Sequence, residues 1–86
     1  MGRIDTVGVT TRYLGPTNAR GSRIKVTAAG RSKVVAYDHS ARSAHIRAIV
    51  DAWDFFGFGT LGEATYVAES ESGRGSVYSV TYEVTA

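Results

Sequence analysis

One segment of this chain has a helical period, whereas the segments on either side of it alternate with a period of two. Apolar side chains recur at spacings of three and four within residues 41–56, at Ile46, Ile49, Val50, Trp53 and Phe56. This spacing predicts a helix with a single apolar stripe. Such a stripe must be buried against another layer of secondary structure. The alternating segments on both sides predict that layer, so we expect an α+β fold in which one amphipathic helix packs on one face of an antiparallel sheet.

The expected element order is β-β-β-α-β-β, in a single domain that spans residues 1–86. Alternation and β-branched residues predict about five strands, at residues 7–14, 23–28, 32–38, 64–69 and 76–85. Residues 15–21 contain the only proline and form a loop, and residues 29–31 form a tight hairpin turn. Ser40 is expected to cap a helix that begins at Ala41 and ends at Gly57. Residues 58–62 are expected to form a loop and residues 70–75 a polar turn.

Charge is divided sharply along the chain. Residues 1–47 contain nine Lys or Arg and two acids, whereas residues 48–86 contain one Arg and six acids. The formal net charge of +2 conceals this division. A domain polarised in this way presents an electric field to its partners, so we expect a binding function.

Composition excludes several classes of protein. There is no cysteine, and therefore neither a disulfide framework nor a thiolate metal site. No apolar run is long enough to span a membrane, and the N-terminus has no secretory signal. We therefore expect a soluble protein in the cytoplasm, with no membrane partner.

The basic residues of the first half suggest a surface for phosphate groups. Arg23 and Lys25 alternate along one expected strand, and Lys33 and Tyr37 alternate along the next. Cations at this spacing suit a phosphate backbone, and Tyr37 could stack on a base. Arg12, Arg20 and Arg31 complete the predicted basic set. The same residues would also suit an acidic protein surface, or would simply keep one face of a sheet solvated.

The loop at residues 15–21 has two interpretations. Its glycines, together with Asn18, Arg20 and Arg23, could form an anion cradle of backbone and side-chain donors. The same residues also satisfy the turn chemistry of a long hairpin loop. No P-loop signature is present, because the Gly-Lys-Ser/Thr ending is missing.

Histidines and aromatic residues support no reaction. His39 and His45 are six residues apart, which does not place them on one helical face, and no ligand spacing for a metal is present. We expect no catalytic residue, no metal and no cofactor. Phe55 and Phe58 lie beside the predicted stripe, so they either close the core or mark a protein interface. The acidic half could also meet the basic half of a second copy, which would give a homo-oligomer.

The segment from Tyr13 to Lys25 reads YLGPTNARGSRIK. It resembles small phage and mobile-element proteins that carry a YLGPTNxRGSRIK motif, followed by a Tyr-Asp pair and a helix bearing a histidine. Here Tyr37-Asp38 and His45 continue the resemblance, which covers the first two-thirds of the chain and ends near Gly59. It implies a phage origin, and hence the cytoplasm of a bacterial host, but no activity.

These observations favour a non-enzymatic phage accessory protein that binds a macromolecule. Nucleic acid is the leading partner, bound through a basic sheet face and loop. A protein that binds and modulates a host factor is the alternative, and homo-oligomeric assembly is a further one.

Overall fold

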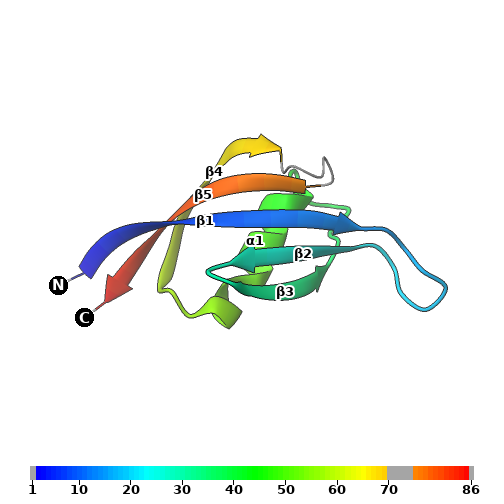
Figure 1. Ribbon diagram of the computed structural model, residues 1–86, viewed down its shortest axis with the longest axis horizontal. Helices are drawn as coiled ribbons and strands as arrows, with labels where there is room; N and C mark the ends of the chain where they lie inside the picture. Colours follow the sequence, from blue (N-terminus) through cyan, green and yellow to red (C-terminus); the bar gives the residue numbers. More distant parts are fainter. Residues whose placement is uncertain (1, 70–74, 86) are drawn as a thin grey trace.

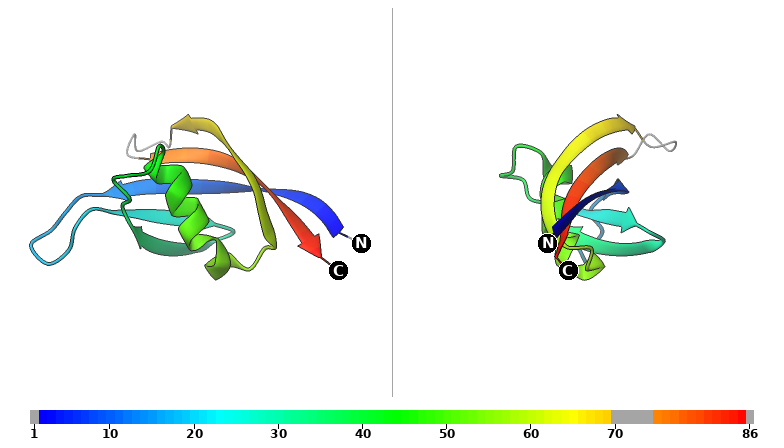
Figure 2. Two further views of the ribbon diagram at one scale, coloured as in Figure 1. Left: turned by 180° about the vertical axis from the view of Figure 1, so that it is seen from behind. Right: turned by 90° about the vertical axis from the view of Figure 1, so that its left-hand side faces the viewer.

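The computed structural model describes residues 2–69 and 75–85, and it has the predicted α+β architecture. A five-stranded antiparallel sheet carries one helix on one of its faces (Figures 1 and 2). The elements are β1 (Gly2–Leu14), β2 (Arg23–Ala28), β3 (Arg31–Ala36), α1 (Ala44–Phe56), β4 (Thr60–Glu69) and β5 (Gly75–Thr85). The strand order is β3-β2-β1-β5-β4. Except for Gly75, the predicted turn at 70–75 lies outside the described residues.

Strand β1 is the centre of the sheet and is longer than the sequence predicted. Its register with β5 runs from Gly2 opposite Thr85 to Arg12 opposite Gly75. Its C-terminal part pairs with β2 on the other side. The prediction began this strand at Val7, because residues 2–6 lack the dense β-branched pattern. Pairing with β5 extends it, so the two chain ends lie together at one end of the molecule (Figure 1).

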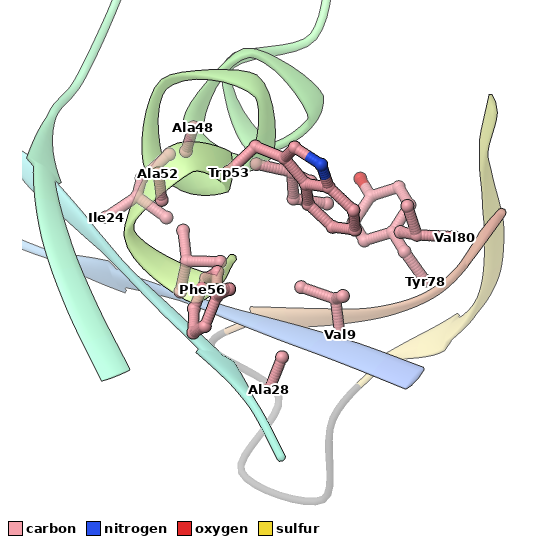
Figure 3. Packing of buried hydrophobic residues seen from close by; sticks show 11 residues of the cluster. Val9, Ile24, Ala28, Ala48, Ala52, Trp53, Phe56, Tyr78 and Val80 are labelled. Atoms are coloured by element: carbon pink, nitrogen blue, oxygen red, sulfur yellow. The ribbon is translucent and has the colours of Figure 1, made fainter. Parts of the chain in front are cut away.

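The core lies between α1 and the sheet face that the helix covers. Val9, Ile24, Val26, Tyr78 and Val80 contribute from the strands, and all are at most 5% exposed. From the helix come Ala48, Ile49, Ala52, Trp53 and Phe56 (Figure 3). The predicted stripe was wrong at Val50, which is 42% exposed, and it omitted the two alanines. Alanine has no side chain beyond Cβ, so the turns containing Ala48 and Ala52 can approach the sheet closely.

The helix begins at Ala44 and is capped by Ser43, so the prediction of Ser40 as the cap was wrong. Ser43 has an extended backbone, and its Oγ accepts a hydrogen bond from the Ile46 N–H at 3.3 Å. Ser40 instead donates through its N–H and its hydroxyl to Asp38 Oδ1, at 2.9 and 2.6 Å. These hydrogen bonds lower the pKa of the Asp38 carboxyl. The predicted end is confirmed, because Gly57 has a φ of 69° in the left-handed region.

Strand β4 begins at Thr60, inside the segment that was predicted to be a loop. The glycines at 59 and 62 suggested that loop, yet Leu61 pairs with Tyr82. Gly62 lies at an irregularity in the register between Leu61 and Ala64, where a Cβ would collide with Thr81. A glycine is therefore needed for close approach between strands, which is its role in many β-bulges.

The β2–β3 hairpin has a two-residue turn, Ala29–Gly30, rather than the three residues predicted. Both residues have positive φ, 52° and 75°, as a type I′ turn requires. Such a turn places Ala28 opposite Arg31 and Val26 opposite Lys33. This register decides which basic side chains share a face of the sheet.

Candidate nucleic-acid interface

The register divides the predicted basic residues between the two faces of the sheet. Lys33 pairs with the buried Val26 and Arg31 with the buried Ala28, so both lie on the face that α1 covers. Arg12, Arg23 and Lys25 lie on the opposite face, which we call the open face. The sequence-based expectation grouped all five with Tyr37, and the structure does not bring them together.

The open face carries a basic cluster, which we define as Arg12, Arg23 and Lys25. Arg12 and Lys25 are direct cross-strand partners on β1 and β2. Arg23 lies two residues from Lys25 on the same face, a separation of about 7 Å along the strand. Directly opposed like charges destabilise a sheet, and here the described residues offer no carboxylate that forms an ion pair with either member.

The described strand positions that neighbour the basic cluster on the open face of β2 and β3 carry no charge. The open-face positions of β2 and β3 beyond it are Thr27, Ser32, Val34 and Ala36, and the Thr27 and Ser32 hydroxyls lie 2.8 Å apart in a hydrogen bond. The nearest carboxylate that the register places on the open face of β1 and β5 is Glu83, opposite Ile4. Eight residues of β1 separate Ile4 from Arg12, about 26 Å at about 3.3 Å per residue. That distance exceeds the Debye length of about 8 Å at physiological salt, so Glu83 does not screen the basic cluster.

Arg23 retains hydrogen-bonding capacity that the described residues do not use. Its Nε atom is buried and has no hydrogen-bond partner among them. Arg12 and Lys25 are exposed. The basic cluster therefore combines two exposed cations, Arg12 and Lys25, with the half-buried Arg23 on one face of the sheet.

The predicted loop forms an arm that extends beyond the sheet, at the end opposite the chain termini (Figures 1 and 2). We call residues 15–22 the arm. It holds Asn18 and Arg20, and residues 15–21 are all exposed. At its tip the Thr17 N–H donates to the Arg20 carbonyl at 2.7 Å, and the Thr17 hydroxyl accepts from the Ala19 and Arg20 N–H groups at 3.3 and 3.1 Å. The arm contains no acid.

The root of the arm is fixed through Ser22. The Ser22 carbonyl accepts from the Tyr37 N–H at 3.1 Å, and its hydroxyl lies 3.0 Å from the Tyr13 hydroxyl. The Tyr37 ring packs edge-on against Tyr13 at 5.6 Å and lies 4.7 Å from the His39 ring. Tyr37 therefore supports the arm from the covered side, rather than standing beside Arg23 and Lys25 as a stacking surface.

Arg31 and Lys33 are engaged at the C-terminal end of α1. Arg31 donates to the carbonyls of Phe55 and Phe56 at 3.3 and 3.4 Å, and its guanidinium lies 4.6 Å from the centre of the Phe55 ring. The Lys33 ammonium lies 5.7 Å from the same ring. The last turn of α1 has no basic residue of its own, so Arg31 supplies the positive charge that favours a helix C-terminus.

The two phenylalanines that were candidates for an interface differ in environment. Phe58 is partly buried and its ring stacks on Phe56 at 5.7 Å, with Trp53 and Tyr82 also close by. Phe55 is 40% exposed beneath the two cations. Of these two phenylalanines, only Phe55 presents substantial aromatic surface.

A buried polar pair was not foreseen from the sequence. The hydroxyl of Thr11, which is fully buried, lies 2.6 Å from His45 Nδ1 and 3.3 Å from the Ser76 carbonyl. Burial lowers the pKa of His45. A threonine at an inward position of β1 and a histidine near the start of a helix were the available signals.

The described part of the chain encloses no pocket, and its His, Cys, Asp and Glu residues form no group of three that could hold a metal ion. No helix among residues 2–69 and 75–85 is long and apolar enough to cross a membrane. Comparison with protein-family models, with curated proteins and with solved structures finds no match for this chain.

Proposed function

We propose that this protein is a non-enzymatic nucleic-acid-binding protein that contacts phosphates through Arg12, Arg23 and Lys25. Arg20 and Asn18 in the arm extend the same surface. In the setting that the sequence resemblance implies, it would act as a phage accessory protein in a bacterial host. Arg31, Lys33 and Tyr37 are no longer part of the proposed surface, because they lie on the covered face.

The direct pairing of Arg12 with Lys25 is the observation that carries the proposal. A sheet gains stability from opposite charges at such positions and loses stability from like charges. A polyanion that binds across the pair replaces the repulsion between the two cations by attraction to its own negative charges. Association with phosphates also releases counterions from the nucleic acid, which provides most of the affinity of non-specific binding.

The phosphate contacts of the basic cluster predict a steep dependence of affinity on salt, and these contacts by themselves do not distinguish one base sequence from another. The logarithm of the association constant falls with the logarithm of salt concentration, with a slope of about −0.9 for each phosphate contact on duplex DNA. Three to four cations therefore give a slope of about −3. The binding of a fluorescent random-sequence duplex, measured by anisotropy at several salt concentrations, provides this slope.

A double substitution of Arg12→Ala and Lys25→Ala tests the site itself. We expect the double variant to change the slope of the logarithm of the association constant against the logarithm of salt concentration from about −3 to about −1. It should also lose most of its binding at about 50 mM salt. Lys33→Ala with Arg42→Ala is the matched control, because it removes the same charge from the covered side of the sheet and from the segment before α1. Equal losses in both double variants would indicate a non-specific effect of net charge, and no duplex binding at about 50 mM salt would refute the proposal.

Poly-glutamate distinguishes nucleic acid from an acidic protein surface. If the basic cluster recognises phosphates, duplex DNA should displace bound poly-glutamate at a low phosphate concentration. Displacement of bound DNA by poly-glutamate should require a much higher carboxylate concentration. Tighter binding of poly-glutamate would instead favour an acidic protein as the partner.

A further inference from the structure

We propose, as an extension of the function above, that the partner is B-form duplex DNA and that the arm enters its major groove. The inference rests on the proposed function, because the basic cluster must first bind phosphates. It adds the type of nucleic acid, the groove, and the two side chains that contact bases, Asn18 and Arg20.

The length of the arm matches the depth of a groove. Leu14 and Arg23 are the last pair in the register of β1 and β2, so residues 15–22 lie beyond the sheet. Four residues on each leg span up to about 13 Å. The major groove of B-form DNA is about 8.5 Å deep and about 12 Å wide. The tip can therefore reach the floor of the groove while the root stays outside it.

The width of the arm selects the major groove. The arm consists of two chain segments that return on each other, and Thr17 and Arg20 flank the tip on opposite legs. The minor groove is only about 6 Å wide, whereas the major groove admits a two-stranded ribbon. The major groove of A-form RNA is too narrow for side chains to read, so the same arm would be excluded from duplex RNA.

The basic cluster lies where the rim of that groove would be. Arg23 belongs to the root pair, and Arg12 and Lys25 form the pair two residues further from the tip. This separation along the strands is about 7 Å. With the tip at the floor, the three cations lie beside the phosphates that border the groove, and no acid of the arm opposes the approach.

The tip carries residue types that recognise base edges. Arginine forms two hydrogen bonds with guanine and asparagine forms two with adenine, both in the major groove. Thr17 fixes the turn by accepting two backbone hydrogen bonds, and Ser22 fixes the root. Because the tip is already ordered, base contacts would cost little conformational entropy.

The test compares one base sequence as duplex DNA, duplex RNA and single-stranded DNA, using the intact protein and two variants. In the first variant, Asn-Gly replaces residues 16–21, which gives a two-residue type I′ hairpin turn. The second variant is Arg20→Ala, and Lys33→Ala is its control with the same loss of charge. Circular dichroism and thermal unfolding establish that each variant folds.

We expect the intact protein to prefer duplex DNA, and the shortened arm to bind all three nucleic acids with similar, weaker affinity. On the best sequence selected from a randomised duplex pool, Arg20→Ala should lose about five- to a hundredfold in affinity, and Lys33→Ala much less. Replacing guanine by 7-deazaguanine removes the N7 acceptor from the major groove, and it should weaken the intact protein but not Arg20→Ala.

Two results overturn the inference in different ways. Equal binding of all three nucleic acids, unaffected by shortening the arm, removes the groove contact and leaves the phosphate-binding function intact. Failure to bind any of the three removes both.

Discussion

The two faces of the β1–β3 sheet use basic residues in opposite ways. On the covered face, Arg31 donates to carbonyls at the end of α1 and lies against the Phe55 ring, so its charge serves the fold. On the open face, Arg12 and Lys25 oppose each other and form no ion pair with a described residue. The comparison teaches that the number of cations says little about binding, and that the register decides which of them remain available to a partner.

The largest contrast should come from two neighbours on β2. Ile24 is fully buried on the covered face, so Ile24→Ala should lower the free energy of unfolding by about 2–5 kcal/mol. Lys25→Ala, one residue further on the open face, should change it by no more than about 0.5 kcal/mol. Urea denaturation of both variants measures the difference, and similar losses in the two would contradict the assignment of faces.

Arg31→Ala should separate stability from binding. Loss of the hydrogen bonds to Phe55 and Phe56 should lower the free energy of unfolding by about 1 kcal/mol. The affinity for duplex DNA should change little, whereas Arg23→Ala should weaken it and leave stability nearly unchanged. Thermal unfolding measures the stability of the two variants, and anisotropy titration measures their affinity for DNA. A loss of binding in Arg31→Ala but not in Arg23→Ala would indicate that the covered face, rather than the open face, binds DNA.

A charge reversal at Arg12 should have a smaller and opposite effect on stability. Arg12→Glu converts a like-charge pair into an opposite-charge pair with Lys25, which should raise the free energy of unfolding by about 0.2–1 kcal/mol. It should abolish binding to DNA at the same time. Lys33→Glu is the control, because its cross-strand partner is Val26 and it gains no such pair. A destabilised Arg12→Glu would show that the two side chains do not interact.

His45 should give the smallest effect, seen as a dependence of stability on pH. Burial lowers its pKa below the ordinary value of 6.5, so the unfolded chain binds the proton more readily than the folded protein. Stability is therefore full above about pH 6.5 and falls as the pH drops toward the lower pKa of the folded state. Chemical denaturation between about pH 5 and 7.5 should show this slope, and His45→Gln should flatten it. An unchanged slope in the variant would assign the effect to other groups.

Much of the fold could be predicted from local patterns. The bounds of β2 and the helix end at Gly57 were predicted correctly, since alternation and a left-handed glycine are strong local signals. The helix start was wrong, because Ser40 and Ser43 both fit a cap and only the hydrogen bonds of Asp38 distinguish them. The first residues of β1 and β4 depend on pairing with β5, which the local sequence does not reveal.

The candidate site was predicted only in part, for a related reason. Alternation within β2 predicted that Arg23 and Lys25 share one face of the sheet, and the structure confirms this. Lys33 and Tyr37 were added without a register between strands. Reading Ala29–Gly30 as a two-residue turn would have placed Lys33 opposite the buried Val26, because a shift of one residue moves a side chain to the other face.

The most direct test of the central claim is a nuclear magnetic resonance titration that follows the arginine Nε–Hε signals as a short random-sequence DNA duplex is added. If the open face binds phosphates, the signals of Arg12 and Arg23 should shift together, whereas those of Arg31 and Arg47 should remain in place. Arg47 is held by Asp38 and Asp51, which makes it an internal reference. Shifts confined to Arg31 and the Phe55 edge, or no shift at low salt, would contradict the account.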